Sequence, residues 1–201
     1  MKKITPYLWA VALILFLSAT DQVHAQMQVP AASPAAHVSQ VVGFTKISID
    51  YSSPAIKGRK VFGELEKFGT PWRAGANSPT TIEFSTAVNI EGTDLAPGKY
   101  TLFVTPQTSG DWTVHLNSKG NAIYAYMTDG KVDAEALAKD DAVTIKVTPE
   151  ALASTKERLA YSISPENNKV GKVSLAWDKV KLSFLVDTQV DQKIENFKTA
   201  F

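Results

Sequence analysis

The sequence predicts a mainly β fold, an antiparallel β-sandwich or jelly-roll-like domain that ends in a short C-terminal helix. Two observations predict it. Apolar residues alternate with polar residues along most of the chain, which is the pattern of strands that bury one face. Helical periodicity is confined to residues 133–139 and the C-terminus. The alternation favours antiparallel sheets, because strands of parallel sheets are apolar on both faces, and a closed barrel is the alternative architecture.

Residues 1–25 have the composition of a bacterial-type secretory signal peptide. The segment begins with positive charge, continues as an unbroken apolar run over 8–17, and ends in Val23-His24-Ala25, which predicts cleavage before Gln26. A membrane span needs about 20 apolar residues, so this run is too short for an anchor. We therefore expect an exported chain, periplasmic or secreted, with no transmembrane segment after cleavage.

Composition sets two further boundaries. Residues 26–43 are rich in Ala, Pro, Ser and Gln. They lack sustained periodicity and predict a flexible leader or an extended arm. Residues 44–201 are expected to form a single β-sandwich domain, with an amphipathic helix over 188–201.

Six runs in this domain show the alternation of half-buried strands. Each run places its apolar side chains on one face and its polar side chains on the other. Turn signals at Pro97-Gly98 and over 108–110 lie between runs. The expected buried faces are Ile47, Ile49 and Tyr51; Ile82 and Phe84; Tyr100, Leu102 and Val104; Trp112, Val114 and Leu116; Val143, Ile145 and Val147; and Leu159, Tyr161 and Ile163.

The last strands predict a hairpin. Apolar residues lie symmetrically about Asp178-Lys179, ending at Trp177 on one side and resuming at Val180 on the other. A two-residue turn would produce this symmetry, although the turn lacks the favoured Gly.

Two short helices are expected. Residues 133–139 would form two turns. The C-terminal helix would be capped by Thr188 or Asp187, and its apolar stripe would pack over a sheet edge or an open end of the sandwich; a partner-binding helix is the alternative. The stripe consists of Val190, Ile194, Phe197 and Phe201.

Balanced charge and the lack of cysteine exclude several classes of function. The chain has 21 Lys and Arg against 20 Asp and Glu, and removal of residues 1–25 would leave no excess of either sign. Nucleic acids and anionic membranes reward a basic excess, so neither is expected as the main partner. Without Cys, disulfides and thiolate chemistry are excluded.

No metal and no cofactor is expected. After the signal peptide the histidines are His37, in the leader, and His115, in a strand. Without Cys, a zinc site would need Asp or Glu for most of its ligands, and the chain has no EF-hand loop for calcium. Its glycines do not precede a convincing helix, so a phosphate cradle lacks its structural context.

The candidate ligand-binding residues surround a turn-rich segment from Gly69 to Asn77 (GTPWRAGAN). In a binding cleft its Trp would stack on a sugar or a flat apolar group, and its Arg would hold a carboxylate through two hydrogen bonds. In a structural role the Trp would cover one end of the sandwich, and the Arg would bond loop carbonyls or pair with Glu64 or Glu83. The candidate residues are Trp72, Arg73, Asn77, Thr80, Arg59 and Tyr51.

A hydrolase is an alternative. A Ser-His-Asp triad would have to use His115, which is expected to be a partly exposed histidine on the polar face of its strand. The chain has no Gly-x-Ser-x-Gly elbow, so the catalytic residues stay unknown. Two facing carboxylates would support glycoside hydrolysis, and Glu83, Glu64 and Asp111 are the candidates.

An ordered series of motifs resembles a known family. The motifs are Tyr51 to Pro54, Lys57-Gly58-Arg59, Phe62-Gly63, Pro71 to Asn77, Thr80, Pro97 to Tyr100, and Trp112. Together they resemble the domain-of-unknown-function family DUF2911, over about 47–186. The resemblance implies an exported, mostly β domain of Bacteroidetes-type bacteria, and it brings no catalytic residue, substrate or cofactor.

The function expected from these observations is non-covalent binding of a small molecule, a glycan or an envelope component. The first alternative is a hydrolase that uses His115 or a carboxylate pair. The second is a structural or assembly module of the cell envelope, in which the leader or the C-terminal helix engages a partner.

Overall fold

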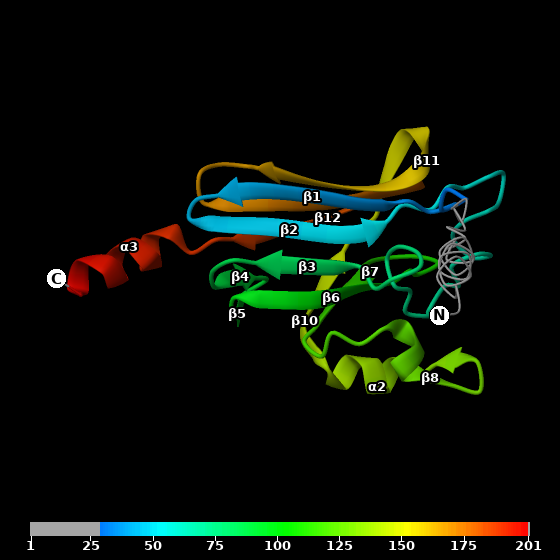
Figure 1. Ribbon diagram of the computed structural model, residues 1–201, viewed down its shortest axis with the longest axis horizontal. Helices are drawn as coiled ribbons and strands as arrows, with labels where there is room; N and C mark the ends of the chain where they lie inside the picture. The colour runs from blue at the N-terminus through cyan, green and yellow to red at the C-terminus, as the bar shows by residue number, and fades with distance from the viewer. Residues whose placement is uncertain (1–28, 201) are drawn as a thin grey trace, which may run out of the picture. The chain divides into compact units, whose positions relative to one another are not determined.

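The computed structural model describes residues 29–200, so the predicted signal peptide lies outside the described residues. Residues from Ala31 onward form one compact unit, a sandwich of two antiparallel sheets (Figure 1). The six-stranded sheet has the order β1-β2-β3-β6-β7-β10, and the four-stranded sheet has the order β11-β12-β4-β5. The predicted mainly β fold with a short C-terminal helix is confirmed. The strands are β1 (Ala35–Val42), β2 (Thr45–Ser52), β3 (Thr81–Phe84), β4 (Val88–Ile90), β5 (Thr93–Leu95), β6 (Gly98–Thr105), β7 (Trp112–Asn117), β10 (Asp141–Val147), β11 (Glu150–Pro165) and β12 (Val170–Asp187).

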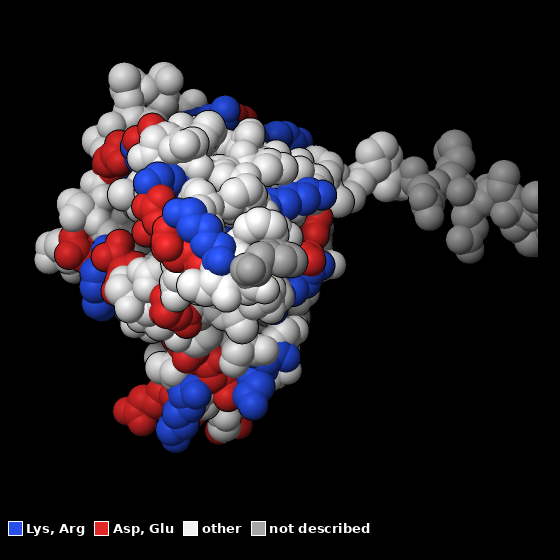
Figure 2. Space-filling view, turned by 90° about the vertical axis from the view of Figure 1, so that its left-hand side faces the viewer, with Lys and Arg blue, Asp and Glu red and all other residues white. Residues whose placement is uncertain are grey.

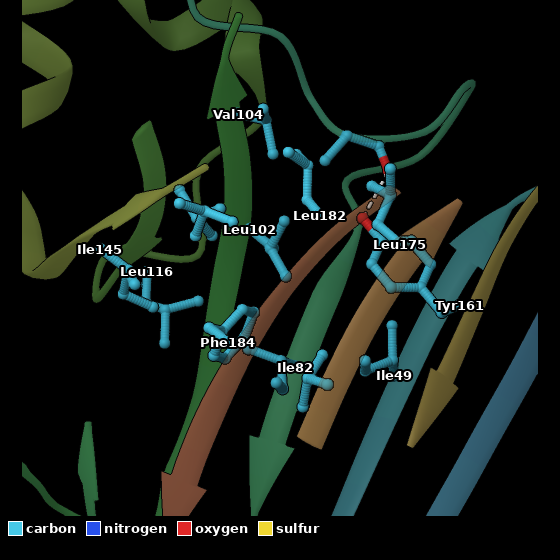
Figure 3. Close-up of a cluster of buried hydrophobic side chains, with 14 of the residues drawn as sticks. Ile49, Ile82, Leu102, Val104, Leu116, Ile145, Tyr161, Leu175, Leu182 and Phe184 are labelled. Carbon is cyan, nitrogen blue, oxygen red and sulfur yellow. Dashed lines mark hydrogen bonds between the residues drawn. The ribbon is translucent and has the colours of Figure 1, made fainter. Parts of the chain in front are cut away.

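The core lies between the two sheets. All six runs predicted from alternation are strands, and their apolar faces are buried except at Tyr51, which is half-buried. Figure 3 shows side chains of the six-stranded sheet, such as Ile82 and Leu102, close to Leu175 and Phe184 of β12. Each such side chain contributes about 1.5–3 kcal/mol when fully buried, so this interface is the main source of the domain's stability.

Residues 35–42 form β1, so the predicted flexible leader over 26–43 is wrong for this part of the chain. β1 pairs with β2 along its whole length, from Ala35 opposite Ser52 to Val42 opposite Thr45. Within the strand, only Val42 is buried. An edge strand with little buried surface needs no strong alternation of apolar residues. The sequence pattern therefore did not reveal β1.

The predicted hairpin about Asp178-Lys179 is wrong. Val170–Asp187 is one continuous strand, β12, and Asp178 lies inside it with φ 54°. The pairing with β11 shifts register on both sides of the Lys156–Asp178 pair, which marks a β-bulge. Side chains along a regular strand alternate between its two faces, so residues 177 and 182 would point to opposite sides. The left-handed conformation of Asp178 breaks this alternation, and Trp177 and Leu182 are therefore both buried in the core. A turn and a bulge produce the same change of alternation in sequence.

A separate layer covers the outer face of β6 and β7 (Figure 1). Leu137, Ile123 and Tyr126 pack there with Phe103 of β6 in a second hydrophobic cluster. β7 is therefore buried on both faces, so the prediction of a partly exposed His115 is wrong. We call residues 118–140 the cap segment; it contains the 3-10 helix η1 (Ile123–Tyr126), strands β8 (Met127–Thr128) and β9 (Lys131–Val132), and helix α2 (Ala134–Lys139).

Helix α2 confirms the helix predicted over 133–139. Asp133 is its N-cap, and its carboxylate accepts a hydrogen bond from the backbone N–H of Ala136 at 2.9 Å. Asp favours this position because its side chain satisfies a backbone N–H that has no partner inside the helix.

The C-terminal helix α3 spans Val190–Thr199, within the predicted range 188–201. Its N-cap is Gln189, without a side-chain capping bond, so the predicted cap at Thr188 or Asp187 is wrong. The Thr188 hydroxyl instead donates to the carbonyl of Lys169 at 2.7 Å. Phe201, the last residue of the predicted stripe, lies outside the described residues.

The apolar stripe of α3 is buried at its first residue and partly exposed further along. Val190 is buried, whereas Ile194 and Phe197 are 38% and 69% exposed, so the stripe is covered less completely than the prediction implies. Polar contacts also hold the helix. Lys193 Nζ donates to the carbonyls of Thr188 and Ala87 at 2.6 and 2.8 Å. Figure 2 shows this end of the domain, where charges of both signs are interspersed with uncharged surface.

No helix within residues 29–200 combines the length and the apolar character needed to cross a bilayer.

The bulge in β12 can be tested by substitution. Asp178→Val should lower the free energy of unfolding by about 1–2 kcal/mol, because a β-branched residue disfavours the left-handed region. Asp178→Gly should cost less, because glycine enters this region freely. Urea unfolding of both variants measures the difference, and equal losses would contradict a left-handed residue at this position.

Candidate functional site

The predicted site residues lie on a long loop, residues 53–80, between β2 and β3, apart from Tyr51 at the end of β2. In Figure 1 this loop lies at the end of the sandwich opposite α3. Backbone hydrogen bonds fix it at several points, among them Ile56 N–H to the Glu157 carbonyl at 2.9 Å and Gly69 N–H to the Pro106 carbonyl at 2.8 Å. Long irregular loops need such bonds, because buried backbone groups must find partners.

Trp72 anchors this loop in the core. Its ring is 5% exposed and stacks on Trp177, with ring centroids 5.5 Å apart. Its backbone pairs with Val104 of β6 through hydrogen bonds of 2.8 and 2.9 Å, and its indole N–H donates to the Gly75 carbonyl at 3.1 Å. The ring is committed to packing, so it does not offer an open face for stacking on a sugar.

Thr80 and Tyr51 belong to a buried support beneath the loop. The Ala74 carbonyl accepts hydrogen bonds from the Thr80 hydroxyl at 3.2 Å and from the Tyr161 hydroxyl at 2.8 Å. Burial, with Tyr51 nearby, raises the pKa of Tyr161 well above its ordinary value, so its hydroxyl stays protonated and able to donate. Tyr51 packs its ring edge against Tyr161 at 4.8 Å.

Arg59 and Asn77 bond carbonyls of neighbouring segments. Arg59 donates to the carbonyls of Ile56 and Ala55 at 2.9 and 2.6 Å. Asn77 has φ 54° and donates through its side chain to the Ser33 carbonyl at 3.0 Å. Asn tolerates this left-handed conformation better than most residues, and both residues make the contacts that a loop-anchoring role predicts.

Arg73 differs from these residues, because part of its guanidinium is not engaged. Its Nη1 donates to the Asn77 carbonyl and to the Tyr124 hydroxyl, both at 3.1 Å, and the guanidinium lies 5.4 Å from the centre of the Tyr124 ring. Within residues 29–200, its Nε and Nη2 donate to no other residue. The side chain thus keeps a pair of donors that the described residues do not use.

Arg73 lines a cleft between the loop and the cap segment, which we call the Arg73 cleft. Its volume is about 220 Å³. Of the predicted site residues, the structure brings Trp72 and Arg73 into this cleft, whereas Thr80, Asn77, Arg59 and Tyr51 do not line it. The lining residues are Leu65, Glu66, Lys67, Thr70, Pro71, Trp72 and Arg73 from the loop, and Ile123, Tyr124, Met127 and Val132 from the cap segment.

Sequence reasoning missed the other lining residues, among them Tyr124 of the cap segment and the acidic residue Glu66. Glu66 is half-buried, and desolvation raises the pKa of its carboxyl from 4.5 to about 7, although the positive charges of Arg73 and Arg59 oppose this rise. In sequence it stands in a charged stretch with Glu64 and Lys67. Such a stretch resembles a solvated surface, so nothing in the sequence distinguishes Glu66 from its neighbours.

His115 lies outside the Arg73 cleft. Its Nδ1 lies 2.6 Å from an Asp141 carboxylate oxygen, and its Nε2 lies 2.9 Å from the Thr105 hydroxyl. The other Asp141 oxygen, Oδ1, is buried without a hydrogen-bond partner in the structure. The histidine therefore sits in a buried polar chain on the face of β7 that the cap segment covers.

The three candidate carboxylates do not converge. Glu64 lies 3.6 Å from Lys60 and Glu83 lies 3.9 Å from Lys99, while Asp111 accepts from the Thr148 hydroxyl at 2.6 Å. Among residues 29–200, no three His, Cys, Asp or Glu side chains gather as a metal-ligand group.

The anchoring role of Trp72 gives a stability prediction. Trp72→Ala should lower the free energy of unfolding by about 3–5 kcal/mol, because it removes a buried aromatic side chain. Tyr124→Ala, at a side chain 63% exposed, should change it by about 0.5 kcal/mol or less. Urea unfolding compares them, and similar losses in the two variants would contradict the anchoring role.

Glu66 gives a pH prediction. Its carboxyl binds a proton more tightly in the folded state, where its pKa is about 7, than at the ordinary value of 4.5. Its contribution to stability is therefore lost as pH rises through 7. The side chain of Glu66→Gln cannot ionise. The free energy of unfolding of this variant minus that of wild type should therefore increase between pH 5 and 8. Urea unfolding across this range measures the gain, with Glu64→Gln as the matched control. A constant difference between Glu66→Gln and wild type would refute the raised pKa.

Comparison with known proteins identifies the family. A family model described as a protein of unknown function, DUF2911, matches residues 33–186, which include both sheets and the Arg73 cleft. No match was found among curated proteins or among solved structures. The chain belongs to the DUF2911 family of proteins of unknown function.

Proposed function

We propose that the protein binds a small molecule non-covalently in the Arg73 cleft. The observation that carries the proposal is the half-used guanidinium of Arg73, which keeps its Nε and Nη2 donors at the wall of a cleft of about 220 Å³. Binding sites usually combine an apolar lining with a few polar groups that fix orientation. Here the apolar side chains come from both walls, and the polar side chains are Glu66, Lys67, Thr70, Arg73 and Tyr124.

The rigid support of the loop favours the same proposal. Trp72 precedes Arg73 directly and is fixed by its stack on Trp177 and by its backbone bonds to Val104. A site held in place before binding loses less conformational entropy when the ligand arrives. The loop anchors therefore also serve to position Arg73.

Export belongs to this proposal as well. The positively charged start, the apolar run over 8–17 and the small residues before Gln26 favour secretion to the periplasm or the medium. The ligand would then be a small molecule of that compartment, a glycan fragment or an envelope component.

Hydrolysis is the second candidate, and the polar chain from Asp141 through His115 to Thr105 is the observation that favours it. A His between a carboxylate and a hydroxyl resembles the arrangement of a nucleophilic triad. It has less support than binding, because the Thr105 hydroxyl belongs to a buried residue and His115 does not line the Arg73 cleft.

Ligand-induced thermal stabilisation tests the binding proposal. A ligand that binds only the folded state at 100 times its dissociation constant adds about 2.7 kcal/mol of stability. We expect at least one compound from a library of metabolites and glycan fragments to raise the melting temperature of the mature wild-type protein. The rise should disappear in Arg73→Met and persist in Lys60→Met, whose exposed side chain lies outside the cleft. A ligand whose effect survives Arg73→Met would place the site elsewhere, and a library without hits would count against binding.

A further inference from the structure

The charges of the Arg73 cleft restrict the ligand that it takes. Arg73 supplies a permanent positive charge, because a guanidinium stays protonated at all physiological pH values. Glu66 supplies the acidic group of the same cleft. The ligand must therefore be compatible with the permanent positive charge of Arg73 and with the titratable carboxyl group of Glu66.

The unoccupied donors of Arg73 suit a carboxylate. Nη1 is taken by the Asn77 carbonyl and the Tyr124 hydroxyl, which leaves Nε and Nη2 as neighbouring donors on one edge of the guanidinium. Two parallel hydrogen bonds from such an edge match the two oxygens of a carboxylate. The guanidinium also lies 5.4 Å from the centre of the Tyr124 ring, and its two Nη1 bonds favour one orientation of this edge.

The rest of the lining suits a small apolar body. Leu65 and Met127 are 39% and 36% exposed, and Ile123 and Val132 line the same cleft. An apolar cavity of about 150 Å³ holds a benzene ring, so a cleft of about 220 Å³ has room for one ring or a short aliphatic chain with an acidic group. A large glycan or a peptide would extend beyond it.

Glu66 would oppose such a ligand when it is ionised. The charged groups that act on it are Arg73 of the same cleft and Arg59, and Lys67 also lines the cleft. Desolvation outweighs their attraction and raises the pKa of the carboxyl to about 7, so both its protonated and its ionised forms are populated near neutral pH. A bound carboxylate would bring a second negative charge close by and favour protonation further. A protonated Glu66 can also donate a hydrogen bond, which an ionised one cannot.

We propose that the Arg73 cleft binds a small apolar carboxylate, with Arg73 holding the carboxylate and Glu66 taking up one proton from solvent as the ligand binds. This inference rests on the proposed binding function and adds its ligand class. Uptake of one proton makes the dissociation constant rise with pH, by up to tenfold per unit above pH 7.

Calorimetric titration of the mature protein tests this inference. The probes are phenylacetate, indole-3-acetate and hexanoate, and the comparison ligands are phenylacetamide, which is neutral, and 2-phenylethylamine, which is a cation. At least one carboxylate should bind at pH 6.5, with a dissociation constant at least tenfold lower than that of either comparison ligand. Titrations in two buffers of different ionisation enthalpy at pH 7.5 should show net proton uptake.

Two variants separate the roles of the charged groups. Arg73→Met should weaken carboxylate binding at least tenfold. Glu66→Gln should keep binding but remove the pH dependence and the proton uptake, whereas Lys60→Met should behave as wild type. Unfolding curves without ligand confirm that each variant is folded.

Three results would overturn the inference: tighter binding of the amine or the amide, a carboxylate affinity that does not change with pH in wild type, or no binding by any of the three carboxylates. If another compound binds and Arg73→Met abolishes its binding, the binding function stands and only the ligand class fails. If no compound binds in a way that depends on Arg73, the binding function fails too.

Discussion

The stack of Trp72 on Trp177 is the contact on which the organisation of the loop end of the sandwich depends. It joins the long loop 53–80 to β12 of the opposite sheet, while the backbone of Trp72 pairs with Val104 of the six-stranded sheet. Phe62 packs edge-on against both indole rings. One residue thus links the loop to both sheets, and the irregular segment around it can remain rigid without regular secondary structure.

The two sides of the loop make different contacts, and the cleft lies on the outer side. The inner side of the loop is taken up by anchors such as Trp72 and Thr80, whose hydrogen bonds satisfy buried backbone groups. Its outer side faces the cap segment, and Arg73 and Glu66 lie there with polar capacity that the protein itself does not use up. Neighbouring residues in sequence therefore differ in their surroundings: Trp72 is packed in the core, whereas Arg73 lines the cleft.

The sandwich could be predicted from sequence because alternation of apolar and polar residues reflects burial directly. In β10, for example, Val143, Ile145 and Val147 are the buried residues, and the alternation alone identifies them. It failed where burial comes from elsewhere in the chain. The outer face of β7 looked solvated, because the cap segment that covers it is a separate stretch of chain. β1 gave no periodic signal as an edge strand, and the bulge at Asp178 imitated a turn. The candidate loop could be recognised in the sequence from its Trp and Arg. Glu66 could not, because its raised pKa results from partial burial, and its charged neighbours in sequence suggest an exposed segment.

The position of Lys193 has a consequence for how the chain reaches this fold. Its ammonium group donates to the hydroxyl of Thr45, which lies 148 positions earlier, at 3.2 Å, so the first strands and the last helix meet at one end of the sandwich. Contacts between such distant segments must overcome the entropy of closing a long loop, and a fold rich in them forms slowly. During synthesis the β1–β2 pair emerges early, yet this junction can close only after α3 has left the ribosome. A product truncated before Lys193 would lack this hydrogen bond to Thr45.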